Sequence, residues 1–190
     1  MATEHSKQTS ALANRTLARF DALELGTCLA FNRAARRPGI RLLFAAVSRL
    51  GDGVFWYVLM LLLPLLYGLD GLKLSLQMAV AGLLGLAIYK TLKSRLVRER
   101  PFVSDAGILC GTAPLDRYSF PSGHTLHAVL FTSLAIGSFP ILGWILLPFA
   151  LLVSLSRVIL GLHYPTDVVV GAAIGLGLAR ITVTLSGIGA

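Results

Sequence analysis

The sequence predicts an all-α protein: an integral membrane helical bundle of about five transmembrane helices, preceded by amphipathic interfacial helices. Composition is the first indication, since 55% of the 190 residues are hydrophobic and 14% are charged, whereas a soluble domain carries about 25% charged residues. The second is a set of long uncharged runs at 53–69, 74–89 and 118–156. The third is that Cys28 and Cys110 are far apart and lack metal-ligand spacing, which argues against a disulfide scaffold or a zinc module.

The first 50 residues are more polar than the rest. Residues 1–15 are predicted to be a disordered N-terminus. In 16–50, apolar residues recur at helical spacing among charged ones, so this segment is too charged to span a membrane comfortably. We expect it to form amphipathic helices that lie in the membrane interface. Residues 51–190 then form a single membrane core.

The uncharged runs define the spans of this core. As one helix, the run at 118–156 would be about 58 Å long at 1.5 Å per residue, whereas a bilayer core is about 30 Å thick. It should therefore form two spans, joined by a turn at 137–140 where Gly and Pro interrupt it. The expected spans are 52–69, 72–94, 121–138, 141–160 and 165–186. Pro64 is expected to kink the first.

The net charge of +8 indicates which classes of partner the protein binds. On so apolar a chain it favours anionic lipid or phosphate groups over nucleic acid. We therefore expect the partners to be the membrane bilayer and a lipid substrate, with no nucleic acid. The sequence carries no signal for an oligomeric state.

Three groups of ionisable residues lie at span ends that this topology places on one membrane face. The first contains Lys93 and Arg100, which are about two helical turns apart and so share a helix face. Pro101 then ends the helix. Two cations on one face can clamp an anion, or they can belong to a basic stripe that contacts lipid headgroups. Arg95 and Arg98 are expected to meet headgroups.

The second group is the run Pro121-Ser122-Gly123-His124, which carries the signals of a helix start. Free N–H groups at a helix N-terminus bind anions, and Gly lets a ligand come close. His124 would then lie beside any bound anion. The alternative is an ordinary capped helix with an incidental histidine.

The third group is Ser156-Arg157, followed by His163 and Asp167. Arg157 ends the longest uncharged run, where an isolated arginine is costly. His163 and Asp167 are about one helical turn apart, so the carboxylate can bind one imidazole nitrogen and make the other a better base or nucleophile. The alternative is a structural His–Asp pair at a helix start.

Together the groups supply cations, helix-end N–H donors and two histidines on one face. Phosphoryl transfer needs these parts: donors that hold the oxyanions, a nucleophile, and an acid for the leaving oxygen. No DxDxDG, HExxH or GxxxxGK[ST] element is present in the sequence, so neither a metal nor a nucleotide route is indicated, and no cofactor is expected.

In order and spacing, the motifs resemble the signature of the type 2 phosphatidic acid phosphatase and vanadium haloperoxidase superfamily, in its integral-membrane lipid phosphatase branch. The matching pattern is Lys93-x6-Arg100-Pro101, Pro121-Ser122-Gly123-His124 and Ser156-Arg157-x5-His163-x3-Asp167. The resemblance implies a metal-independent phosphatase with a phosphohistidine intermediate.

The resemblance also implies a role for each site residue. His163 is the expected nucleophile and Asp167 its orienting partner. His124 is the expected acid that protonates the leaving group and then the base that activates water. The expected phosphate-binding residues are Lys93, Arg100, Ser122, Gly123 and Arg157.

Because the predicted site lies at a membrane interface, a lipid phosphate or diphosphate is the expected substrate. Analogy with compact bacterial members of the family favours undecaprenyl diphosphate, and phosphatidylglycerophosphate, phosphatidate and the 1-phosphate of lipid A are alternatives. A lipid-phosphate transporter that uses the basic cluster only for binding is a rival of another class. A transporter, however, needs polar groups near the midplane, whereas here they gather at one end.

The expected location is a bacterial cytoplasmic membrane, and two arguments differ on which face carries the site. All 17 Lys and Arg residues except Lys73 and Arg180 fall on the side of the N-terminus and the site. The positive-inside rule then favours the cytoplasmic face. A role in undecaprenyl diphosphate recycling, by family analogy, favours the periplasmic face.

Overall fold

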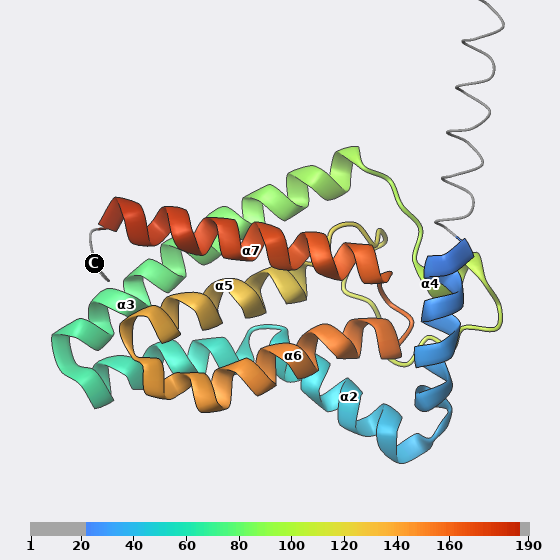
Figure 1. The fold of residues 1–190 in the computed structure, drawn as a ribbon, viewed down its shortest axis with the longest axis horizontal. Coiled ribbons are helices and arrows are strands. Elements are labelled where there is room, and N and C mark those ends of the chain that lie inside the picture. The colour runs from blue at the N-terminus through green and yellow to red at the C-terminus, as the bar shows by residue number, and fades with distance from the viewer. Residues whose placement is uncertain (1–21, 187–190) are drawn as a thin grey trace, which may run out of the picture.

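The computed structural model describes residues 22–186 of the chain. Within this range the protein is built from helices and contains no strand, as Figure 1 shows. The predicted all-α class is confirmed. The predicted disordered N-terminus at 1–15 lies outside the described residues.

Two helices joined by a short 3-10 turn lead into the bundle. The first covers residues 22–32, η1 follows at Arg33–Arg36, and α2 runs over Pro38–Gly51. α2 starts with a proline, whose missing N–H would have no partner in the first turn anyway. Figure 1 places both helices at the end of the bundle where α6 ends and α7 begins. The segment predicted to be amphipathic therefore contains helices, and its place in the membrane interface stays a prediction.

α3 (Val54–Arg95) is a helical hairpin rather than one straight helix. The chain reverses at Gly68, whose φ of +58° lies in the left-handed region that favours glycine. The two arms pack against each other, and the Ser75 hydroxyl donates to the Met60 carbonyl over 2.7 Å. The arms correspond to the first two expected spans. The break between the arms falls at Gly68, because glycine adopts the required backbone conformation easily. Pro64 lies inside the first arm, and the kink expected there stays a prediction.

The remaining helices are α4 (Pro101–Ser104), α5 (Gly123–Ser138), η2 (Pro140–Leu142), α6 (Gly143–Ile159) and α7 (Pro165–Ser186). The break between α5 and α6 falls within the turn expected at 137–140. α5 is the central helix, because it packs against α3, α6 and α7 and buries Leu126, Leu130 and Leu134. The elements that carry the three motifs are therefore held around one core helix.

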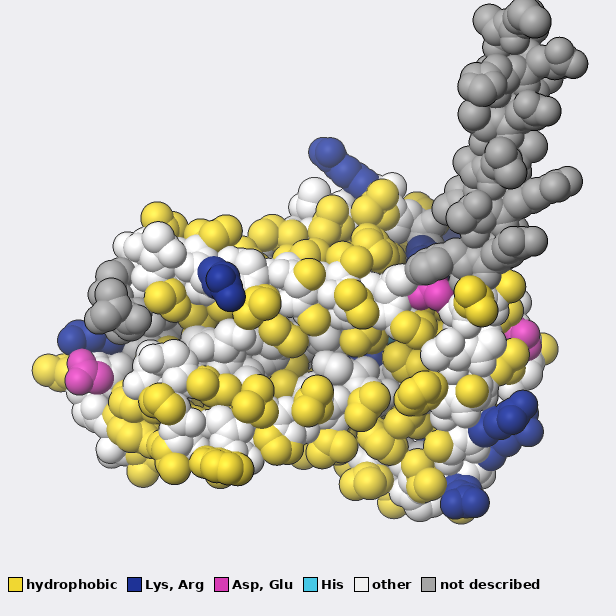
Figure 2. All heavy atoms as spheres, in the orientation of Figure 1, with side chains coloured by type: hydrophobic (Ala, Val, Ile, Leu, Met, Phe, Trp, Pro, Cys, Tyr) yellow, Lys and Arg dark blue, Asp and Glu magenta, His cyan; other side chains and the backbone are white. Residues whose placement is uncertain are grey.

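The outer surface of the bundle is apolar. Leu65, Trp144 and Leu185 are each at least 80% exposed, an arrangement that suits lipid and not water. Figure 2 shows hydrophobic side chains over most of the face between the two ends of the bundle. The helical stretches long and apolar enough to cross a membrane are Val54–Arg95, Pro140–Ile159 and Pro165–Ser186. These features agree with the predicted integral membrane protein.

Candidate active site

The three predicted groups converge at one end of the bundle around a cavity of about 420 Å³. α3 and α6 end there and α5 and α7 begin there, so four helix termini deliver polar side chains to one place. The predicted residues that line the cavity are Lys93, Arg100, Gly123, His124, Arg157 and His163. Ser122 and Asp167 are fully buried beside them. The structure thus brings all the predicted site residues together.

Two arginines of the cavity are almost wholly buried. Arg100 and Arg157 are each 2% exposed, and a buried cation is costly unless it has partners. Arg100 Nη1 donates to the Leu162 carbonyl over 2.7 Å, and Arg157 Nη1 contacts the Ser48 hydroxyl. Arg157 Nε has no partner among the described residues. The cavity therefore retains cationic donors for an anion, as a phosphate clamp requires.

Asp116, in the loop before α5, is a site residue that the sequence analysis missed. Its Oδ1 accepts hydrogen bonds from Lys93 Nζ over 2.6 Å and from Arg100 Nη2 over 2.7 Å. Burial alone would raise the pKa of Asp116, but these two cations hold it below its usual range, so the carboxylate is ionised at neutral pH. It occupies donors that a phosphate would use, and a substrate must therefore displace it or share them.

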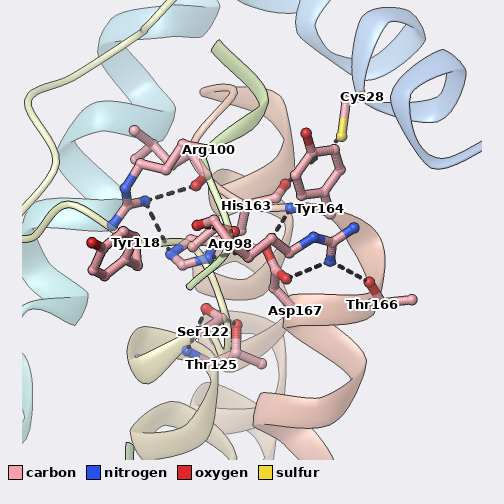
Figure 3. A network of polar contacts seen from close by, with 12 residues as sticks. Cys28, Arg98, Arg100, Tyr118, Ser122, Thr125, His163, Tyr164, Thr166 and Asp167 are labelled. Atoms are coloured by element: carbon pink, nitrogen blue, oxygen red, sulfur yellow. Dashed lines mark hydrogen bonds and ion pairs between the residues drawn. The ribbon is translucent and has the colours of Figure 1, made fainter. Parts of the chain in front are cut away.

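His163 lies between Asp167 and Arg100, as Figure 3 shows. Its Nδ1 is 3.5 Å from Asp167 Oδ2, which is long for a hydrogen bond, and its Nε2 is 3.4 Å from Arg100 Nη1. Nδ1 therefore has no hydrogen-bond partner in the described part of the chain, although such contacts in enzymes often tighten only when substrate binds. Burial and the charges of Arg157 and Arg100 lower the pKa of His163 well below its usual value. The ring is therefore neutral at physiological pH, as a nucleophile must be.

Ser122 serves the start of α5. Its hydroxyl accepts from Thr125 N over 3.4 Å and lies 3.0 Å from Thr125 Oγ1. Its N–H donates to the Asp167 carbonyl over 3.0 Å, which ties the start of α5 to the start of α7. Gly123, the next residue, lines the cavity. Ser122 is thus a helix cap in this structure, and its role as an oxyanion donor stays a prediction.

His124 has a carboxylate partner that the sequence analysis also missed. Its Nε2 contacts Oδ1 of Asp52, the residue that follows α2, and both residues line the cavity. Burial and the charge of Arg157 favour the neutral form of this imidazole, and the Asp52 carboxylate opposes them by favouring the protonated form that a general acid needs. The segment before α3 therefore contributes to the site, although all the motifs lie in 93–167.

The expectation that Arg98 meets lipid headgroups is wrong. Its guanidinium turns inward, with Nη2 2.5 Å from Glu24 Oε2 and Nη1 2.7 Å from Asp167 Oδ1. The physical reason is that both carboxylates are buried. A buried charge without a partner is strongly destabilising, so the ion pairs with Arg98 stabilise the protein more than a contact with exposed headgroups would. Arg95, in contrast, is exposed, as expected of a residue that contacts headgroups.

The other half of the cavity is apolar. Its side chains come from both arms of α3 and from α5: Trp56, Met60, Met78, Leu83, Leu86 and Phe131. His127 also lines the cavity, and its Nδ1 and Nε2 lie 2.8 and 3.1 Å from the Gly123 and Gly82 carbonyl oxygens. The cavity thus joins a cationic end to an apolar groove, an arrangement that suits a ligand with an anionic head and a hydrocarbon tail.

Comparison with known proteins agrees with this chemistry. Residues 71–187 match the family model described as the PAP2 superfamily. An undecaprenyl-diphosphatase of Sulfolobus acidocaldarius is 27% identical over 88% of this chain and 79% of its own length. A decaprenylphosphoryl-5-phosphoribose phosphatase of Mycobacterium tuberculosis is 31% identical over 80% of this chain and 83% of its own length.

Two solved structures share the fold. Aquifex aeolicus LpxE has a TM-score of 0.75 at 27% identity, and the match covers 85% of this chain and 95% of LpxE. A transmembrane PAP2-type phosphatidylglycerolphosphate phosphatase of Bacillus subtilis has a TM-score of 0.64 at 24% identity, over 89% of this chain and 87% of its own. Both matches include most of the helices that surround the cavity.

Proposed function

Since the chain belongs to the PAP2 superfamily and is an integral-membrane lipid phosphatase, we propose that it hydrolyses a polyprenyl diphosphate, with undecaprenyl diphosphate as the first candidate. One observation carries the proposal: a cavity joins cationic donors to an apolar groove. A linear isoprenoid chain can enter one groove while its diphosphate meets the cations. The name of the Sulfolobus relative supports the same substrate class.

The first chemical step forms a phosphohistidine. Nε2 of His163 attacks the terminal phosphorus, a P–N bond forms, and the bond from phosphorus to the leaving oxygen breaks. Arg100 and Arg157 stabilise the charge on the phosphoryl oxygens. Asp167 stabilises the positive charge that develops on the imidazole of His163. His124 donates its proton to the leaving oxygen, so that the polyprenyl monophosphate departs.

The second step releases inorganic phosphate. Water attacks the phosphorus, the now neutral His124 accepts a proton from that water, and the P–N bond breaks to return neutral His163. Protein cations balance the phosphate charge in both steps, so the proposed mechanism needs no metal ion. Within residues 22–186, no group of three or more His, Cys, Asp and Glu side chains is arranged to hold one.

A phosphate monoester on a polyprenyl-linked sugar is the second candidate substrate, because the mycobacterial relative is named for that chemistry. It would use the same groove for its tail. Its leaving alkoxide is more basic than a phosphate, so it depends more strongly on the acid His124. By analogy with the bacterial relatives, we propose that the protein lies in a bacterial cytoplasmic membrane.

Phosphate release from purified lipids tests the substrate. The panel contains undecaprenyl diphosphate, a polyprenyl-linked phosphosugar, phosphatidylglycerophosphate, phosphatidate and lipid A, each assayed with and without EDTA. We expect the fastest release from undecaprenyl diphosphate, and equal rates in EDTA. A higher kcat/KM for a glycerolipid would overturn the proposed substrate, and loss of activity in EDTA would overturn the metal-independent mechanism.

The covalent step is tested with a substrate labelled with phosphorus-32. We expect acid-labile label on His163, and none in His163→Ala. His124→Ala should still form the phosphohistidine from para-nitrophenyl phosphate, whose leaving group hardly needs a proton, and should fail on a lipid monophosphate. Label on His124, or turnover without label on either histidine, would contradict the assignment of roles.

A further inference from the structure

We propose that Glu24 and Arg98 are positioning residues for the catalytic carboxylate. In this proposal the helix at 22–32 uses Glu24 to hold Arg98, and Arg98 holds Asp167 in the orientation that serves His163. The inference rests on the proposed role of His163 as the nucleophile. It assigns a catalytic purpose to an N-terminal segment that lies outside all three motifs.

Arg98 bridges the N-terminal helix and α7. Its Nη2 lies 2.5 Å from Glu24 Oε2, and its Nη1 lies 2.7 Å from Asp167 Oδ1. The same Nη1 donates to Thr166 Oγ1 over 2.8 Å. The guanidinium carbon lies 3.9 Å from the centre of the Tyr164 ring, over its face. Because the guanidinium is a planar fork with fixed donor directions, these contacts determine where Asp167 Oδ1 lies.

The two oxygens of Asp167 have different partners. Oδ1 is bound by Arg98, while Oδ2 accepts from the Tyr164 N–H over 2.8 Å and faces Nδ1 of His163. Asp167 has no exposed surface, and a buried carboxylate needs a cationic partner. Within residues 22–186, Arg98 is the one Lys or Arg that forms an ion pair with it. Arg98 therefore favours the charged form of Asp167 against its burial and leaves Oδ2 for the imidazole.

Glu24 completes the arrangement from the other side. Its Oε1 accepts from the N–H of Thr166 over 2.8 Å and from Thr166 Oγ1 over 2.6 Å. Thr166 lies in the first turn of α7, where a carboxylate satisfies free N–H groups and the helix dipole. Glu24 thus caps the helix that carries Asp167 while its Oε2 binds Arg98. Figure 3 shows Arg98 between Thr166 and Asp167, with Cys28 of the N-terminal helix nearby.

Neither Glu24 nor Arg98 lines the cavity, and this separates a positioning role from a binding role. Loss of Arg98 leaves a buried carboxylate without its cation, so Asp167 gains a proton or turns away and no longer stabilises the charge on the His163 ring. Chemistry should slow while substrate binding stays intact. We expect kcat to fall and KM to change little.

The test uses the full-length enzyme, purified in detergent, with undecaprenyl diphosphate and para-nitrophenyl phosphate as substrates. We expect Arg98→Gln to lower kcat about 10- to 100-fold, a loss typical of residues that orient a catalytic group, with KM within about twofold of the parent. Glu24→Gln should lose less, and Arg98→Lys should recover part of the rate. Arg95→Gln, a change of an exposed neighbour, is the matched control and should behave like the parent.

The double variant Glu24→Gln/Arg98→Gln separates a shared pathway from general damage. If Glu24 acts through Arg98, the double variant loses no more kcat than Arg98→Gln alone. Full additivity, a normal kcat in Arg98→Gln, or a loss confined to KM would overturn the proposal. If Arg98→Gln does not fold, Glu24→Gln and Arg98→Lys provide the same comparison. Failure of the parent enzyme on both substrates would instead overturn the proposed function.

Discussion

At the scale of one residue, a substitution of Arg157 tests whether the buried arginines of the cavity bind the phosphate group. Its guanidinium is buried, and Nε has no partner in the described part of the chain. A lysine would supply a charge but not the planar fork. We expect Arg157→Lys to lose about 3 kcal/mol of transition-state stabilisation, which corresponds to a rate loss on the order of a hundredfold. The measurement is kcat/KM for phosphate release, with the exposed Arg95→Lys as the control.

The same experiment can exclude Arg157 from the clamp. A variant that unfolds would lose activity without any role in binding, so thermal unfolding in detergent must show a folded protein first. A folded Arg157→Lys with turnover close to that of the parent would show that the guanidinium does not hold the phosphate.

Asp52 gives a second prediction, because it contacts the expected general acid, His124. Asp52→Asn removes the charge that favours the protonated imidazole, so proton donation should weaken. We expect a loss of roughly tenfold or more with a lipid monoester and a much smaller loss with para-nitrophenyl phosphate. Asp70→Asn, which changes an exposed carboxylate paired with Lys73, is the control. Equal losses on both substrates would mean that Asp52 supports the fold rather than the proton transfer.

Some site residues could be predicted from the sequence because their spacing carries information. The four-residue spacing of His163 and Asp167 does bring the two side chains together at the start of α7. The helix face expected for Lys93 and Arg100 is wrong, because α3 ends at Arg95 and Arg100 lies in extended backbone before α4. The two cations meet at Asp116 instead. Asp52 and Asp116 could not be predicted, because a single carboxylate in a polar segment has no periodic relation to the residues that it meets in space. The side chain of Arg98 was misplaced because its buried partners, Glu24 and Asp167, are distant in the sequence.

At the scale of elements, α7 approaches α5 closely through Gly171 and Gly175. An added Cβ at Gly175 would collide with the backbone oxygen of Leu126, whereas at Gly177 it would meet nothing within 4 Å. We expect Gly175→Val to destabilise the protein by about 1–3 kcal/mol and to lower activity, because it pushes α7 and its Asp167 away from α5. Gly177→Val introduces the same side chain and should be tolerated.

Thermal unfolding in detergent and phosphate release measure this difference. Identical unfolding temperatures for Gly175→Val and Gly177→Val would show that the close approach of α5 and α7 does not hold the site together.

The helices were largely predictable from the sequence. In a membrane protein, long uncharged runs indicate helices, and Gly and Pro residues indicate where those helices end. The hairpin in α3 was expected as two spans, and its turn falls at Gly68, where the sequence offers a residue free to take positive φ. The docking of the helix at 22–32 onto α7 was not predictable, because amphipathic periodicity shows that a face is buried but not what covers it.

At the scale of the whole molecule, polarity is asymmetric along the bundle. One end carries the cavity, the ionised Asp116 and the cations that bind it, while the middle is apolar (Figure 2). A lipid substrate can therefore keep its tail in the bilayer while its head reaches the polar end. The membrane face that carries the polar end depends on the Lys and Arg residues near the ends of the spans.

The free cations predict that the polar end faces the cytoplasm. Lys90 and Arg95 are exposed there, as are the arginines at 33, 36 and 37 of the N-terminal segment. The opposite end offers the exposed Arg180 and Lys73, and Lys73 is paired with Asp70. Cys110, an exposed thiol in the loop beside the site, reports this face directly, since Cys28 is buried. We expect a membrane-impermeant maleimide to label the protein in inside-out vesicles and not in spheroplasts, at an alkaline pH because burial raises the pKa of Cys110. Cys110→Ser should abolish the label. Labelling of the parent in spheroplasts would place the site on the outer face, where diphosphate recycling by analogy would put it.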